Sequence, residues 1–121
     1  MSSGYLALED GTVFPARSVA APGVAFGEAV FTTAMTGYQE TVTDPSFAGQ
    51  LVTFTAPMIG NYGVDDARLE SPQPWVKAVV MRRCGGAEWA RWLSSHGIVA
   101  LEDVDTRKLV LRIRAAGAMR A

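Results

Sequence analysis

Hydrophobic residues in the first two thirds of the chain form short runs bounded by glycine and proline. Runs of this length are typical of β-strands, and β-branched and aromatic residues suit a pleated, half-buried surface. The Asp10-Gly11 pair accepts the positive φ angles of a tight two-residue turn, which predicts a β-hairpin around it. We expect strands in five segments: residues 5–9, 12–14, 28–34, 50–56 and 77–81.

The last third of the chain has helical periodicity instead. One helix is predicted from residues spaced i, i+3, i+4 and i+7, which are Trp89, Trp92, Leu93 and His96. Gly97 is placed to end it in a left-handed conformation. After a further strand at 98–101, Asp105 is expected to cap a second helix, which ends at Gly117. Its buried face is predicted to be Thr106, Leu109, Val110 and Ile113.

This order of elements defines the expected fold class. Strands first and helices last indicate a single α+β domain over residues 1–121, with a mixed sheet and two late helices. Two stretches rich in small and turn-forming residues, 36–49 and 56–74, are too long to be simple connections. Loops of this kind often carry function, so we expect the functional residues there.

Composition and charge remove several classes of protein. The chain is 49% hydrophobic and 19% charged, as expected of a folded domain. Its 11 basic and 12 acidic residues give a net charge of −1, so nothing drives unspecific binding to nucleic acid or to an anionic membrane. We find neither a transmembrane run nor a secretory leader, and the single cysteine fits a reducing compartment. We expect a cytoplasmic protein.

Cys84 and His96 are the only pair that suggests nucleophilic catalysis. A cysteine nucleophile needs a base and a group that orients the base. The positive charges of Arg82 and Arg83, which precede Cys84 in the sequence, would lower the pKa of its thiol. Neither a Gly-x-Cys-x-Gly nor a His-x-Glu motif is present. We therefore interpret Cys84 as an incidental thiol at the end of a strand and His96 as a helix-capping residue, and a minimal hydrolase built on both is the weakest alternative.

The sequence also offers no complete set of ligands for a metal or a cofactor. One histidine and one cysteine are too few for a zinc site, and Asp65 and Asp66 are adjacent rather than spaced for oxygen coordination. The glycines of residues 60–63 are not spaced to bind a pyrophosphate. We interpret the three tryptophans as core or interface residues: Trp75, Trp89 and Trp92.

Three motifs in the two loops occur together and in order. They are Met35-Thr36-Gly37-Tyr38-Gln39-Glu40, Thr43-Asp44-Pro45-Ser46-Phe47-Ala48-Gly49-Gln50 and Ile59-Gly60-Asn61-Tyr62-Gly63. In these motifs the chain resembles the amino-terminal domain of carbamoyl-phosphate synthase small chains. The resemblance extends from Leu6 to Arg120, with one departure at residues 83–89, where the family commonly carries a longer acidic and serine-containing connection.

The resemblance implies a swivelling β/β/α domain that works inside a larger enzyme. In that family the small chain also carries a class I glutamine amidotransferase domain, which these 121 residues do not contain and whose Cys-His-Glu triad releases ammonia from L-glutamine. The large chain uses ATP with Mg, bicarbonate and the ammonia to make carbamoyl phosphate for arginine and pyrimidine synthesis. This domain is then expected to dock the large chain in a heterodimer, to hold no cofactor and to be inactive alone.

One residue is implied as a direct ligand of glutamine. The resemblance places Ser46 against the substrate in the pocket of the neighbouring domain. Pro45 fixes one backbone angle and Asp44 can accept hydrogen bonds from nearby amides, so the turn would present the Ser46 hydroxyl rigidly. We expect the loop glycines to shape the backbone rather than to bind a ligand: Gly37, Gly49, Gly60 and Gly63.

A rival interpretation keeps the scaffold and changes the function. The chain would then be a free-standing binding module that recognises a small ligand or a protein through residues 36–49. A serine that merely closes a turn is the structural alternative for Ser46.

Overall fold

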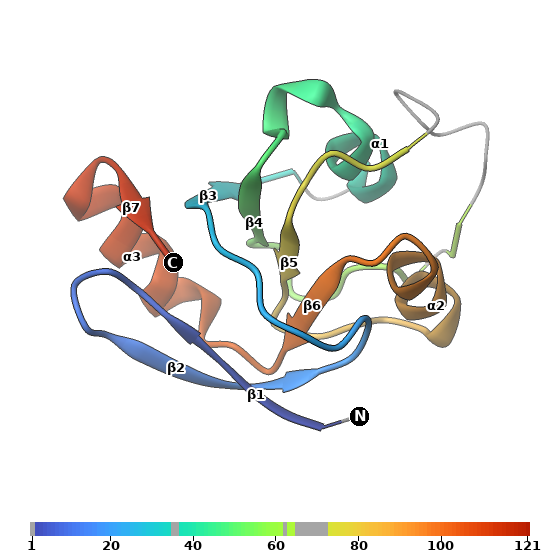
Figure 1. Ribbon diagram of the computed structural model, residues 1–121, viewed down its shortest axis with the longest axis horizontal. Coiled ribbons are helices and arrows are strands. Elements are labelled where there is room, and N and C mark those ends of the chain that lie inside the picture. Colours follow the sequence, from blue (N-terminus) through green and yellow to red (C-terminus); the bar gives the residue numbers. More distant parts are fainter. Residues whose placement is uncertain (1, 35–36, 62, 65–72) are drawn as a thin grey trace.

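The computed structural model describes residues 2–34, 37–61, 63–64 and 73–121 (Figure 1). In these ranges the strands are β1 (Ser2–Ala7), β2 (Val13–Ser18), β3 (Glu28–Thr32), β4 (Gln50–Phe54), β5 (Ala78–Val80), β6 (Val99–Glu102) and β7 (Met119–Arg120). The helices are α1 (Tyr38–Thr43), the 3-10 helix η1 (Pro45–Phe47), α2 (Ala87–Ser95) and α3 (Thr106–Ala116). The domain is α+β, as predicted.

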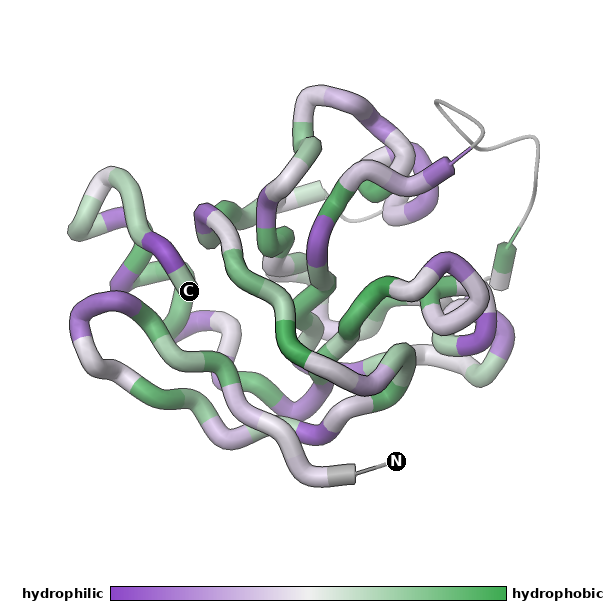
Figure 2. The backbone as a smooth tube through the Cα atoms, in the orientation of Figure 1, coloured by the Kyte–Doolittle hydropathy of each residue, from purple (hydrophilic) through white to green (hydrophobic). Residues whose placement is uncertain are grey.

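The strands form one mixed, curled sheet in the order β1-β2-β6-β5-β4-β3-β7. The four strands β3 to β6 run parallel to one another, whereas β1, β2 and β7 pair antiparallel at the two ends. Buried parallel strands are hydrophobic along their whole length, and β5 (Ala-Val-Val) is buried at every position. The hydrophobic central strands stand out in Figure 2.

Alternation along the central strands creates two hydrophobic cores, one on each face of the sheet. Leu51 and Val52 are neighbours on β4, yet Leu51 belongs to one core and Val52 to the other. Ala100 and Leu101 on β6 are divided in the same way. This follows from the two-residue period of a strand. α1 and α2 pack on one side of the central strands and α3 packs on the opposite side (Figure 1).

The predicted β-hairpin is confirmed, but its turn is not the two-residue type. Leu8 donates to the Thr12 carbonyl at 2.8 Å, and Gly11 donates to the Leu8 carbonyl at 3.0 Å. The loop therefore has three residues and ends at Gly11, whose φ is +91°. Asp10 has no positive φ. An Asp-Gly pair also fits a three-residue loop, in which a type I turn is followed by a left-handed glycine.

Both late helices are confirmed, with their ends. α2 ends at Ser95 with His96 as its C-cap, and Gly97 has a φ of +70°. Asp105 caps α3, because its carboxylate accepts a hydrogen bond from the Lys108 amide at 3.1 Å. Gly117 ends that helix with a φ of +81°. The four residues predicted for its inner face are buried: Thr106, Leu109, Val110 and Ile113.

The prediction of strands first and helices last is wrong. α1 lies between β3 and β4, and β7 follows α3, whereas β6 is the strand that was predicted at 98–101 between the two late helices. α1 was missed because its six residues are too few to establish a helical period. β7 was missed because its two residues make a strand only through their pairing with Glu28 and Ala29 of β3.

Residues 37–49, the described part of the first long loop, contain α1 and η1. Parts of the predicted motifs, namely Met35, Thr36 and Tyr62, lie outside the described residues, as do residues 65–72 of the second loop. None of the helices in the described ranges combines the length and the apolar character needed to span a bilayer.

Candidate functional site

Ser46 lies in a turn that its neighbours hold in place. The Asp44 carboxylate accepts a hydrogen bond from the Ser46 amide at 3.0 Å, and Pro45 occupies the first position of η1. The Ala48 amide closes the turn by donating to the Pro45 carbonyl at 3.1 Å. The Ser46 side chain is exposed, and its hydroxyl makes no hydrogen bond to the described residues. The turn therefore fixes the backbone of Ser46 and leaves its hydroxyl exposed.

The helix before the turn is anchored in one of the two cores. Tyr38 and Val42 of α1 are buried, at 2% and 0% exposure. The Tyr38 hydroxyl donates to the Gly63 carbonyl at 2.6 Å, and its ring lies edge-on to Trp89, with 4.6 Å between the ring centroids. These contacts fix α1, and with it the start of the Ser46 turn.

Backbone hydrogen bonds to one tryptophan fix both sides of the same turn. The Trp75 amide donates to the Val42 carbonyl at 2.8 Å, and the Gly49 amide donates to the Trp75 carbonyl at 3.1 Å. Trp75 is 39% exposed, so its ring is partly available at the surface beside the turn. Trp75 was predicted to lie in a core or an interface. The structure places it, partly exposed, beside the Ser46 turn.

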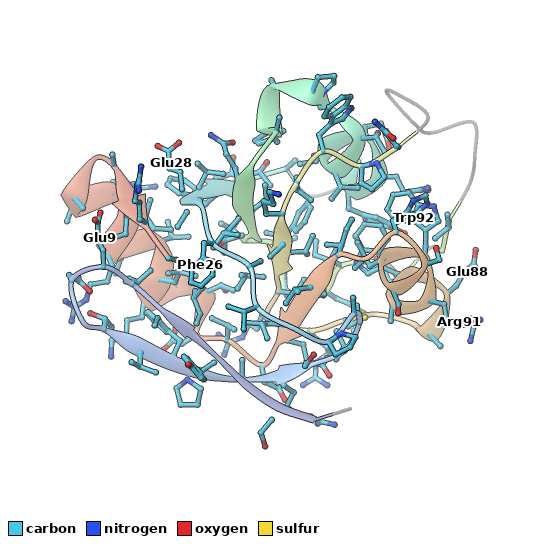
Figure 3. The ribbon with its side chains drawn as sticks, in the orientation of Figure 1. Glu9, Phe26, Glu28, Glu88, Arg91 and Trp92 are labelled. Atoms are coloured by element: carbon cyan, nitrogen blue, oxygen red, sulfur yellow. The ribbon has the colours of Figure 1, made fainter. Side chains whose placement is uncertain are left out.

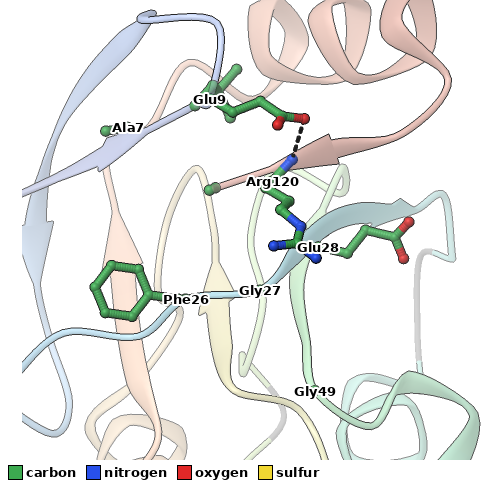
Figure 4. Close-up of a pocket in the computed structure, with 9 residues that line it drawn as sticks. Ala7, Glu9, Phe26, Gly27, Glu28, Gly49 and Arg120 are labelled. Atoms are coloured by element: carbon green, nitrogen blue, oxygen red, sulfur yellow. Dashed lines mark hydrogen bonds between the residues drawn. The ribbon is translucent and has the colours of Figure 1, made fainter.

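A cavity of about 570 Å³ adjoins the turn at the amino ends of β3 and β4 (Figure 4). Gly49, which directly follows the turn, contributes to its lining, and the charged residues around it are Glu9, Glu28 and Arg120. The Glu9 carboxylate accepts a hydrogen bond from the Arg120 amide at 3.0 Å. Glu28 accepts one from the Gln50 side chain, also at 3.0 Å.

Sequence reasoning missed this cavity. Glu9 and Arg120 are 111 residues apart, and only the pairing of β7 with β3 brings them together. Figure 3 shows Glu9, Phe26 and Glu28 gathered on one side of the molecule, away from Trp92 on α2. A lone glutamate in a hairpin loop and a lone arginine near the last residue carry no signal that could have connected them.

Cys84 and His96 have separate environments. The Cys84 thiol donates to the Gly86 carbonyl at 3.5 Å, and the Cys84 amide donates to Glu102 at 2.9 Å. Burial raises the pKa of the Cys84 thiol, and the Glu102 carboxylate raises it further. The His96 ring lies against Trp92, at 4.6 Å between centroids. No described base contacts the thiol, and its environment favours the protonated form, not the thiolate.

Metal ligands do not gather within the described ranges. There, no three histidine, cysteine, aspartate or glutamate side chains come close enough to hold an ion. Asp65 and Asp66 lie outside these ranges.

The four loop glycines shape the backbone, as predicted. Gly37, Gly49, Gly60 and Gly63 all have a positive φ. Gly60 is also pressed against Trp89, because a Cβ atom built there would lie 2.4 Å from the indole ring. A Cβ atom built at Gly27 would lie equally close to the Gly49 carbonyl oxygen. Glycines of the motifs therefore allow close packing, at Gly60 against α2 and at Gly49 against residue 27.

Comparison with known proteins agrees with the motifs. A family model described as carbamoyl-phosphate synthase small chain, CPSase domain, matches residues 6–121. The carbamoyl phosphate synthase small chain of Halobacterium salinarum is 52% identical over 119 residues, which cover 98% of this chain and 33% of that protein. The small chain of Akkermansia muciniphila is 47% identical, and its match covers 96% of this chain and 33% of that protein.

A third relative extends the same result. The small chain of Streptomyces coelicolor is 44% identical over 124 residues, covering 95% of this chain and 32% of that protein. The chain thus spans about a third of the length of the curated relatives that it matches. The extent and the level of these matches show that the chain belongs to the carbamoyl-phosphate synthase small chain family.

Proposed function

We propose that this chain is the amino-terminal assembly domain of the glutaminase subunit of carbamoyl-phosphate synthase. In the complete enzyme a class I amidotransferase domain releases ammonia from glutamine. The large chain, with ATP and Mg, joins that ammonia to bicarbonate, and the product serves arginine and pyrimidine synthesis in the cytoplasm. The domain has the swivelling β/β/α fold, docks the large chain and catalyses no reaction alone.

The exposed hydroxyl of Ser46, on a backbone that Asp44 and Pro45 hold, is the observation that carries this proposal. A serine hydroxyl can donate to the carboxylate of an amino acid or accept from its ammonium group. Asp44 holds the backbone of the turn, so little conformational freedom remains to be lost when a substrate binds. Ser46 thereby contributes one hydrogen bond to glutamine in a pocket that the amidotransferase domain completes.

The test is Ser46→Ala in a full-length small chain assembled with its large chain. Loss of one hydrogen bond is worth about 0.5–1.5 kcal/mol, so the KM for glutamine should rise by a factor of about 2–13. Steady-state assays with glutamine measure this change. The rate with free ammonia should stay unchanged, because ammonia bypasses the glutamine pocket.

Ser94→Ala is the matched control, because Ser94 is an exposed serine on α2 and not on the Ser46 turn. It should leave the glutamine KM unchanged. An unchanged KM for glutamine in Ser46→Ala would remove Ser46 from the glutamine site. An equal loss of activity with glutamine and with ammonia would instead mean that the variant is impaired in assembly.

A further inference from the structure

The outer face of α3 carries a concentration of positive charge. Four basic side chains on this helix are exposed to solvent: Arg107, Lys108, Arg112 and Arg114. The helix contains no acidic residue, although the chain as a whole has a net charge of −1. Lys108 and Arg112 are four positions apart, so their charges are neighbours that repel one another. Opposite charge from outside the helix would therefore stabilise this face.

The domain supplies little of that opposite charge. The Arg112 guanidinium lies 3.9 Å from the Asp10 carboxylate, in a pair that is partly exposed. Solvent-exposed ion pairs contribute little, because water and salt screen them. Among the described residues, no carboxylate pairs with Arg107. Arg107 is thus an exposed cation for which the described part of the domain provides no counter-ion.

Aromatic rings contact the other two cations. The Lys108 ammonium lies 5.8 Å from the centre of the Phe14 ring, and the Arg114 guanidinium lies 5.6 Å from the centre of the Phe31 ring. A ring attracts a cation but leaves its charge in place. The contact also restricts a long side chain, so less conformational freedom is lost when a partner binds the cation.

An apolar side chain lies at the centre of this face. Leu111 is 56% exposed, and the residues three and four positions away on a helix are its surface neighbours. These neighbours are Arg107, Lys108, Arg114 and Ala115. Three cations and one small residue therefore surround the leucine. An apolar centre with a polar rim that contains arginine is the usual composition of a protein–protein interface.

The basic face of α3 lies away from the turn that carries Ser46. The turn directly follows α1, and α1 packs on the opposite side of the central strands from α3 (Figure 1). A partner bound at α3 would therefore not compete with a domain bound at Ser46. The domain can contact two different partners at once.

Charge and apolar content together select the kind of partner. A second copy of this domain in a symmetric dimer would bring the same positive face, and like charges repel. Nucleic acid would bring phosphates but would leave Leu111 without an apolar contact. An acidic protein surface with an apolar centre matches both features of the face.

We propose that the outer face of α3 docks the large chain, which presents to it an acidic surface around an apolar centre. The inference rests on the proposed function, in which the domain docks that chain. It adds the place of docking and the chemistry of the surface that binds there.

The test measures the affinity of the large chain for a full-length small chain that contains this domain. Surface plasmon resonance gives the Kd at about 0.02 M and about 0.3 M salt. Arg107→Glu should raise the Kd at least about tenfold at low salt, because a carboxylate would then face an acidic partner, and by less at high salt. Leu111→Ala should raise it about fivefold at both salt concentrations, because the lost contact is apolar.

Arg91→Glu is the matched control. Arg91 is an exposed arginine on α2, on the opposite side of the central strands from α3 (Figure 1). Its charge reversal should leave the Kd unchanged at both salt concentrations. Arg107 and Leu111 are exposed, so their variants should stay folded, which circular dichroism checks.

Three outcomes overturn the proposal: an unchanged Kd in both α3 variants, an equal loss in Arg91→Glu, and a duplex oligonucleotide or a second small chain that displaces the large chain from α3. In the first outcome the wild type still binds the large chain, so the proposed function stands and only the choice of surface fails. A wild-type small chain that does not bind the large chain would contradict the proposed function and the inference together.

Discussion

The two cores of the domain differ in how completely the chain covers them. In the core that α1 and α2 cover, the inward side chains of these helices, Val42, Trp89 and Leu93, have no exposed surface. On the other face the sheet is covered by α3 and the hairpin, but the groove between β1 and residues 23–26 stays open beside Phe26. The first core is closed by its own helices, whereas the second has an opening that faces outward.

Because of this difference, the closed core stabilises the domain, whereas the exposed side chains beside the groove are available for assembly. The closed core holds the turn that presents Ser46, because α1 is packed into it through Tyr38. The open core lies beneath exposed apolar side chains that contribute little to folding as long as they stay in water. We therefore expect substitutions to have large effects on stability in the closed core and small effects at the exposed side chains that border the groove, such as Phe26.

The largest expected effect is that of Trp89→Ala. Trp89 is fully buried, lies against Tyr38 and donates its indole N–H to the Met81 sulfur at 3.4 Å. Truncating a buried aromatic side chain costs about 3–5 kcal/mol. Urea unfolding followed by circular dichroism measures this loss. Phe26→Ala is the matched control and should stay within about 0.5 kcal/mol, since that ring is 76% exposed. Similar losses for both would erase the contrast between the cores.

Alanine substitutions at two glycines test the tight packing of the closed core. Gly60 and Gly11 both have a φ of +91°. Alanine at either position carries a left-handed penalty of about 1–2 kcal/mol. At Gly60 the new Cβ would also meet Trp89, which adds about 1–3 kcal/mol of overpacking, whereas nothing lies within 4 Å at Gly11.

Thermal or urea unfolding of Gly60→Ala and Gly11→Ala separates these two terms. Gly60→Ala should be the less stable variant by the overpacking term. Equal stability of the two variants would mean that Trp89 moves aside at no cost, and the closed core would then be looser than its packing indicates.

Elements governed by local rules could be predicted from the sequence. Asp105 and Gly117 bound α3 because capping and left-handed termination depend only on nearby residues. The same holds for Gly97 at the end of α2. The hairpin was predicted for the same reason, and only its loop length was wrong, since an Asp-Gly pair fits two kinds of turn.

Elements that depend on distant partners could not be predicted. β7 exists because it pairs with Glu28 and Ala29. The cavity beside the Ser46 turn exists because that pairing brings Arg120 to Glu9. Ser46 itself came from a motif, and only the structure reveals that its side chain is exposed and that Asp44 holds its amide.

The smallest expected effect concerns Cys84, which lies at the edge of the closed core. Burial, with Glu102 beside it, raises the pKa of this thiol above its ordinary value of 9.0. The folded chain thus holds the proton more tightly than the unfolded chain does. The resulting stabilisation is fully present below about pH 9 and is lost as the pH rises through the raised pKa.

The difference in unfolding free energy between the wild type and Cys84→Ser should therefore shrink above pH 9, and alkylation of the native thiol should reach its midpoint above that pH. Taking the difference between the two proteins cancels the contributions of the lysines and tyrosines, which titrate in the same pH range. A midpoint clearly below the ordinary value would mean an activated thiolate. Such a result would support the alternative of a minimal hydrolase built on Cys84 and His96. The closed core would then contribute to catalysis as well as to stability.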